Sequence, residues 1–118
     1  MKTIEGDLTA TTARFAIVAG RFNGFVVESM AAAAVDTLRR HGVDENSITL
    51  VRVPGAFELP IAVGKIIDQG NVDAVITLGA VIRGSTPHFE YVASQCASGI
   101  AAISRETGVP VSFGVLTT

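Results

Sequence analysis

Three short segments of the chain combine glycine with side chains that can bind or transform a small molecule. They cover residues 20–24 (GRFNG), 54–58 (PGAFE) and 83–90 (RGSTPHFE). Each follows an apolar run and precedes a helical pattern, so each is expected at a turn from a strand into a helix. In a parallel α/β sheet these turns share the carboxyl edge, where ligands bind. The three segments therefore predict one common site.

The third segment has the composition of an anion-binding loop. Gly84 lets the backbone approach a ligand closely, Thr86 is a preferred N-cap, and Pro87 suits the first helical position. Free N–H groups at a helix start attract anions, so a phosphate near residues 84–86 is one interpretation. The other is that the same residues only cap the helix, because such caps are common.

His88 falls in the first turn of that predicted helix. The positive end of the helix disfavours the imidazolium, so we expect a neutral ring that can accept a proton. A packed or surface histidine is the alternative, and it would be the better explanation of an isolated histidine. The neighbouring phosphate loop brings the catalytic interpretation level with it. His41 is not a candidate, because a histidine in the last turn of a helix is explained by the helix dipole.

Glu58 and Phe22 each have two interpretations. A carboxylate at a helix start is favoured by the dipole, and it also offers acceptors to the hydroxyls of a polyol. Phe22, on a strand-to-helix turn, can stack on a flat ring or plug the edge of the sheet.

No metal site is expected, because one cysteine and two distant histidines do not make a ligand cluster. The chain also lacks a Walker loop and the GxGxxG motif.

The elements that would position these residues alternate along the chain. The apolar patterns predict strands over residues 14–19, 48–53, 74–82 and 109–116, and helices over residues 24–41, 58–69 and 87–107. Alternation of this kind implies right-handed βαβ units and the α/β class, as a three-layer α/β/α sandwich with a flavodoxin-like parallel sheet. No helix follows the last strand, which would leave part of one sheet face uncovered. We therefore expect that C-terminal helices are missing from this chain.

Composition predicts a single domain over residues 1–118 that associates with copies of itself. Apolar residues make up 48% of the chain and charged residues 17%, against a usual charged fraction of about 25%. Such a small domain would expose much of its apolar surface as a monomer, so a homo-oligomer is expected.

Charge and cysteine usage limit the partners and the compartment. The net charge of −2 gives no reason to bind nucleic acid, which needs a basic surface. Cys96 is the only cysteine, which suits a reducing compartment. No signal peptide and no apolar run of about 20 residues are present, so we expect a cytoplasmic protein without a membrane segment.

Four segments carry a resemblance to a known family. RFN after the first strand, VPGAFELP after the second, GAVIRGSTPHFEYV after the third and the terminal FGVLTT are together similar to lumazine synthase, over essentially the whole chain. Enzymes of this family condense 5-amino-6-(D-ribitylamino)uracil with L-3,4-dihydroxy-2-butanone 4-phosphate. The products are 6,7-dimethyl-8-ribityllumazine, phosphate and water, and neither a cofactor nor a metal is used.

The resemblance also implies roles for individual residues of this chain. Those expected to bind the ribitylaminouracil are Phe22 (stacked on the ring), Asn23 (beside the ring), Ala56 (through its backbone, at the ribityl chain), Phe57, Glu58 (at the ribityl chain), and Val81 and Ile82 (through their backbones, at the uracil edge). Those expected around the butanone phosphate are Gly84, Ser85 and Thr86, with His88 as the proton carrier. Phe113 would reach into the site of a neighbouring subunit.

The same resemblance implies an assembly, a pentamer or an icosahedral shell of pentamers, in which residues 3–7 pair with a neighbour's sheet edge. The family's phosphate-binding Arg and its Lys lie in the C-terminal segment and cannot be assigned here. A companion chain that supplies the C-terminal helices is therefore expected for full activity. The alternative is a non-catalytic scaffold or split fragment of the same fold. A phosphoacceptor domain is excluded, because no Asp ends the first core strand.

Overall fold

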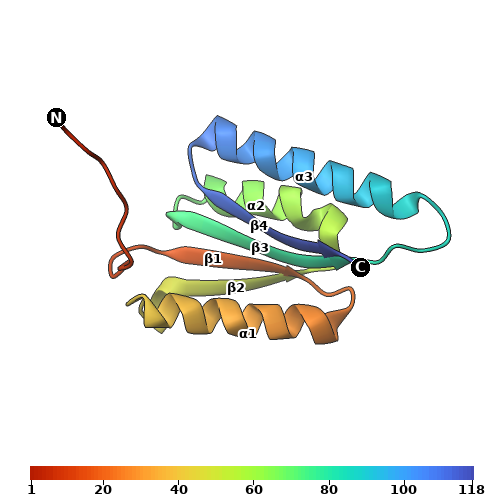
Figure 1. Cartoon of the computed structure of the whole chain (residues 1–118), viewed down its shortest axis with the longest axis horizontal. Coiled ribbons are helices and arrows are strands. Elements are labelled where there is room, and N and C mark those ends of the chain that lie inside the picture. The colour runs from red at the N-terminus through yellow and green to blue at the C-terminus, as the bar shows by residue number, and fades with distance from the viewer.

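A four-stranded, entirely parallel sheet forms the centre of the molecule, and the computed structural model describes all 118 residues (Figure 1). The strands are β1 (Phe15–Gly20), β2 (Ile48–Val53), β3 (Ala74–Val81) and β4 (Val111–Thr117). The helices are α1 (Gly24–Arg40), α2 (Leu59–Asp68) and α3 (His88–Thr107), with 3₁₀ turns η1 (Glu45–Ser47) and η2 (Ala56–Glu58). The order across the sheet is β2-β1-β3-β4, so the chain leaves β1 toward one side and later returns to its other side.

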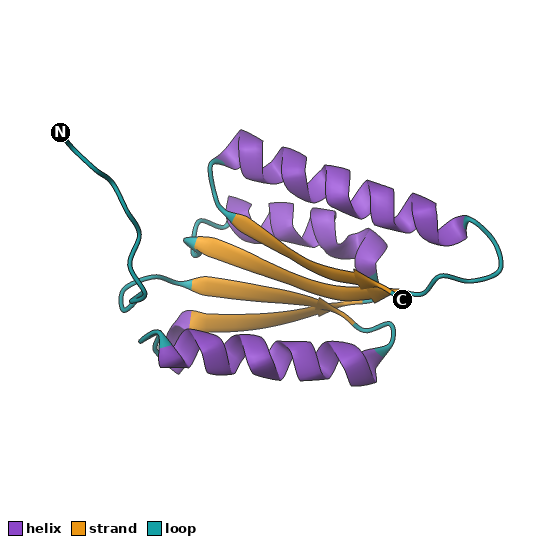
Figure 2. Cartoon of the chain, in the orientation of Figure 1, coloured by secondary structure: helices purple, strands orange, loops and turns teal.

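The helices cover both faces of the sheet, with α1 on one face and α2 and α3 on the other (Figure 2). Side chains of β1 alternate between the two layers: Ala16 and Val18 face α2 and α3, whereas Ile17 and Ala19 face α1. Burial on both faces explains why this strand is a continuous apolar run in the sequence. The predicted three-layer, flavodoxin-like α/β fold is confirmed.

Element boundaries lie within one residue of the predictions except at the start of β4, which begins at Val111 instead of residue 109. The 3₁₀ turn η2 precedes α2, which begins at Leu59, and α3 begins at His88. The late start of β4 has a simple cause. Pro110 has no N–H to donate, and the N–H of Val109 bonds to the Thr107 hydroxyl over 3.2 Å. None of the helices has the length and apolar character needed to cross a membrane.

Two ion pairs tie neighbouring elements together at the surface. The Asp73 carboxylate accepts two hydrogen bonds from Arg14, one from its backbone N–H at 2.7 Å and one from its side-chain Nε at 3.3 Å. These bonds join the amino ends of β1 and β3. Both bonds lower the pKa of the Asp73 carboxyl, and the backbone bond has the larger effect. Glu28 of α1 binds Arg52 of β2 at 2.8 Å, and this bond lowers the pKa of Glu28. Because all four side chains are about half exposed, each pair contributes little to stability.

One part of the sheet is incompletely covered. Leu116 of β4 is in register with Ala80 of β3, whose side chain packs in the layer under α1. Leu116 therefore lies on the α1 face as well, but it is 45% exposed, whereas Ala80 is 2% exposed. The α1 face is thus sealed over β1 and β3 and open at β4.

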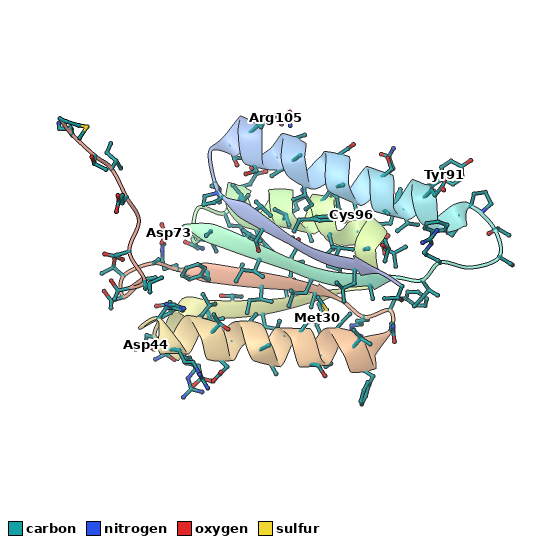
Figure 3. All side chains as sticks on the ribbon, viewed as in Figure 1. Met30, Asp44, Asp73, Tyr91, Cys96 and Arg105 are labelled. Carbon is teal, nitrogen blue, oxygen red and sulfur yellow. The ribbon has the colours of Figure 1, made fainter.

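The other face is covered by α2 and α3, which pack closely against each other. Cys96 lies on the face of α3 that packs against the core, and it is fully buried (Figure 3). Burial raises the pKa of its thiol to about 11, so the side chain stays protonated and serves as a small apolar group.

The contact between α2 and α3 depends on Gly99. A Cβ added there would lie 2.8 Å from both Cβ and Cγ of Pro60, a rigid ring that cannot move aside. We expect Gly99→Ala to destabilise the fold by about 1–2 kcal/mol. Overpacking costs about 1–3 kcal/mol, and the better helix propensity of alanine offsets up to about 1 kcal/mol. Urea unfolding measures the difference.

Gly64 provides the matched control for that prediction. It also lies in the middle of a helix at this contact, but a Cβ there would be 3.9 Å from Ile103 Cδ1, an ordinary contact distance. Gly64→Ala should leave stability unchanged or raise it by up to about 1 kcal/mol. A Gly99→Ala variant as stable as Gly64→Ala would contradict the close approach of the two helices.

Candidate active site

A cavity of about 410 Å³ opens at the carboxyl ends of β1, β2 and β3, beside the start of α3. These strand ends meet on one side of the molecule (Figure 1). The cavity lies where the chain connections diverge from β1, toward β2 on one side and β3 on the other. This is the usual ligand position in open parallel sheets, and the volume suits a small molecule.

The turn after β1 is held against the turn after β2. Arg21 N–H donates to the carbonyl of Val53 at 2.7 Å, and Phe22 N–H donates to that of Pro54 at 3.2 Å. The parallel ladder thus continues past the ends of both strands. It fixes Phe22 at the cavity, where its ring is 57% exposed and free to stack on a ligand.

Asn23 turns the chain from this loop into α1. It is the only non-glycine residue with positive φ (57°), a left-handed conformation that asparagine tolerates well. Its carbonyl accepts the N–H groups of Val26 and Val27 at 3.1 and 3.3 Å, and its side chain makes no capping bond. Asn23 therefore shapes the loop but does not line the cavity, and a binding role for it stays a prediction.

The turn after β2 brings a carboxylate to the cavity. A Cβ on Gly20 would lie 3.3 Å from the carbonyl carbon of Gly55, so the first two turns approach each other where only glycine fits easily. Ala56 is buried in the 3₁₀ turn, and Glu58 ends it half-buried. The Glu58 carboxylate makes no hydrogen bond or ion pair within the chain. Its acceptors are available to donors such as ligand hydroxyls.

The turn after β3 differs from the prediction at its helical end. Thr86 was expected to cap α3, with Pro87 as the first helical residue. Instead Pro87 is the N-cap, and no side chain caps the helix. The first bond of the helix runs from Glu90 N–H to the Pro87 carbonyl at 3.0 Å, so α3 begins one residue later and Thr86 is left outside. The hydroxyls of Ser85 and Thr86 consequently have no partner within the chain.

His88 is the first residue of α3, and its side chain lines the cavity. It makes no hydrogen bond or ion pair within the chain, so its ring nitrogens are available to a ligand. The backbone N–H groups of His88 and Phe89 donate no hydrogen bond either. No group of three or more His, Cys, Asp or Glu side chains is placed to hold a metal ion.

The family comparison agrees with this arrangement. A model of the 6,7-dimethyl-8-ribityllumazine synthase family matches residues 12–118. The chain belongs to the lumazine synthase family. The family acts in riboflavin biosynthesis, and its members are transferases that assemble as oligomers.

Seven of the residues expected to act in a lumazine synthase site line one cavity in this chain. They are Phe22, Ala56, Phe57, Glu58, Val81, Ile82 and His88. They come from three separate turns that are far apart in the sequence, and the parallel sheet brings them together.

Gly84, Ser85 and Thr86 do not line that cavity. All three are exposed in the loop that joins β3 to α3, and the space around Gly84 is open. Phe113 is also apart from it. It pairs in register with Thr77 near the middle of β3 and lines a separate hollow of about 330 Å³ between β4 and α3. Its expected role in a neighbouring lumazine synthase site stays a prediction.

Five residues that line the cavity were given no individual role from the sequence, although three of them lie within the predicted site segments. They are Pro54, Gly55 and Phe89, which lie in those segments, and Ala80 and Val92, which do not. Phe89 and Val92 were assigned to the apolar face of α3, and they do pack against the core. Their position at the amino end of that face was the available signal, because there the apolar face of a helix meets the carboxyl edge of the sheet.

Proposed function

We propose that the chain condenses 5-amino-6-(D-ribitylamino)uracil with L-3,4-dihydroxy-2-butanone 4-phosphate to give 6,7-dimethyl-8-ribityllumazine, phosphate and water. One observation carries the proposal: an aromatic ring, a carboxylate and an imidazole, none of them engaged in a polar contact within the chain, line one cavity. They are Phe22, Glu58 and His88.

The pyrimidine substrate fits the side of the cavity formed by the first two turns. The exposed ring of Phe22 can stack on the flat uracil, and the free acceptors of Glu58 suit the hydroxyls of the ribityl chain. Beyond β3, Ile82 lines the cavity, and its backbone polar groups suit the polar edge of the uracil. Each part of the substrate thus has a partner of matching chemistry.

The phosphate of the second substrate suits the start of α3. The hydroxyls of Ser85 and Thr86 and the N–H groups of His88 and Phe89 are donors without partners in the chain. Free N–H groups at a helix start favour an anion both by hydrogen bonding and by the helix dipole. A phosphate bound here would place the butanone beside the imidazole of His88.

The chemistry then requires proton transfers at one place. The 5-amino group attacks the ketone, and loss of water gives an imine. Removal of a proton from the adjacent carbon expels the phosphate. The enol that remains takes up a proton at its terminal carbon to become a methyl ketone. The ribitylamino nitrogen then attacks this ketone and closes the second ring with loss of water. His88 is the group at the cavity that can accept a proton in one step and donate it in another. Holding both substrates in register supplies a further large part of the rate.

The proposal includes assembly into pentamers or a shell of pentamers, since the resemblance implies a site completed by a neighbour's Phe113. Support comes from the large apolar side chains that the isolated chain exposes. They include Ile4, Leu8, Phe25, Ile61, Tyr91 and Phe113. Phe113 lies on the outer strand of the sheet, where a neighbouring subunit can pack.

A direct assay tests the proposed reaction. With both substrates present, we expect lumazine fluorescence to rise together with released phosphate in a one-to-one ratio, and either substrate alone should give neither signal. Mass photometry on the same sample records the assembly that is being assayed. No product from a folded, assembled sample at saturating substrate would reject the enzyme function and leave the scaffold alternative.

A further inference from the structure

Arg83 makes a contact that none of the proposed roles uses. Its guanidinium carbon lies 5.1 Å from the centre of the Phe89 ring, within the range of a cation–π interaction. Arg83 is at the strand end of the loop of residues 82–87, and Phe89 is the second residue of α3. The contact therefore bridges the loop from one end to the other.

The loop has almost no other support. Its residues are exposed, nothing lies within 4 Å of a Cβ built on Gly84, and no side-chain hydrogen bond or ion pair involves the loop. Outside the strand and the helix, its backbone is tied only at the ends. Arg83 N–H donates to the Thr118 carbonyl at 2.7 Å, and the Pro87 carbonyl accepts from Glu90 at 3.0 Å. Between these two bonds, the contact of Arg83 with Phe89 is the interaction that spans the loop.

Phe89 connects this contact to the cavity. Phe89 lines the cavity and packs against the core between the sheet and α3. It is also the residue that directly follows His88 in the chain. A side chain that fixes the loop against Phe89 also fixes it relative to His88. Ser85 and Thr86, the donors without partners, lie in the part of the loop that would otherwise be free to move.

We propose that Arg83 is a positioning residue, which holds the loop of residues 82–87 against Phe89 so that the loop donors and His88 reach the phosphate-bearing substrate together. The inference rests on the proposed function. A direct role as a phosphate ligand is the competing interpretation. The structure favours positioning, because the guanidinium stacks on Phe89 and Arg83 does not line the cavity.

A double-mutant cycle separates the two roles. The variants are Arg83→Met, Phe89→Leu and the pair, each assayed for lumazine formation. A cation–π contact at an exposed site corresponds to about a two- to five-fold change in an equilibrium. Arg83→Met should lower kcat/KM for the butanone phosphate by that factor, with KM for the ribitylaminouracil unchanged. In the Phe89→Leu background the same substitution should have no further effect.

Two further variants serve as controls for the cycle. Arg83→Lys should recover part of the activity, because an ammonium group also stacks on an aromatic ring. Arg39→Met, which removes an exposed arginine without an ion pair at the far end of α1, should match the wild type. If the loss in Arg83→Met persists undiminished in the Phe89→Leu background, Arg83 acts on the substrate directly and the positioning role is wrong.

Amide hydrogen exchange tests the loop without relying on turnover. Arg83→Met should speed exchange over residues 84–89 by about two- to five-fold and leave residues 75–80 of β3 unchanged. If the wild-type protein makes no lumazine, the proposed function fails and this measurement still decides whether Arg83 holds the loop. Unchanged exchange over residues 84–89 would overturn the inference.

Discussion

Replacing His88 by alanine should lower kcat for lumazine formation by about a hundredfold or more, while a ribityl-pyrimidine analogue binds as tightly as before. General acid–base catalysis contributes about 10²- to 10⁴-fold, and no other imidazole lines the cavity. The variant should keep some activity, because Phe22 and Glu58 still orient the pyrimidine substrate. The folded state should be unaffected, since the His88 side chain is exposed and without a partner in the chain.

Single-turnover kinetics and calorimetric titration of the analogue measure the two halves of this prediction. His41→Ala is the matched control, since His41 is the only other histidine and lies outside the cavity. Its Nδ1 is 2.6 Å from the Leu8 carbonyl, so its loss should loosen the N-terminal segment without changing the chemical step. Turnover of His88→Ala at the wild-type rate would remove His88 from the mechanism.

The architecture could be predicted because burial leaves a direct mark on the sequence. Strands β1 and β3 are covered by helices on both faces, and both are predominantly apolar, with Thr77 the one polar side chain between them. The long amphipathic helices α1 and α3 were placed to within one residue at each end. The start of α3 was misplaced for a local reason. Thr86 and Pro87 suit an N-cap and a first helical residue, but the helix closes its first turn on the Pro87 carbonyl instead.

The candidate site was predicted as far as it depends on the turns that follow the strands. Those turns meet at one edge in any parallel sheet of this order, so Phe22, Glu58 and His88 could be brought together without a structure. Side chains that serve both the core and the cavity were harder to recognise. Phe89 has the helical spacing of a core residue, and only the structure shows its second role.

Contacts across an irregular loop have no periodicity from which to predict them. Arg83 and Phe89 are six positions apart and belong to different elements, and no regular pattern relates them. The role that the resemblance implies for Phe113 would require a neighbouring subunit, so its spacing and its exposure in one chain do not predict that role.

Leu59→Ala should destabilise the fold by about 3 kcal/mol, the largest loss expected of any single substitution considered. Leu59 is completely buried, opens α2 directly after Glu58, and packs in the layer between the sheet and α2 and α3. Its Cδ1 lies 3.5 Å from the position of a Cβ on Gly79, so the side chain rests on β3. Truncation leaves a cavity there, and such truncations cost about 2–5 kcal/mol.

Leu59→Met is the control that separates volume from chemistry. It keeps nearly the same volume, so its cost should stay below about 1.5 kcal/mol. Urea unfolding at fixed protein concentration should show a lower midpoint for Leu59→Ala with an unchanged slope. Because Leu59 anchors the helix that Glu58 precedes, Leu59→Ala should also bind the ribityl-pyrimidine analogue more weakly than Leu59→Met does. Equal unfolding midpoints for the two variants would mean that the turn after β2 is held in place by something other than this side chain.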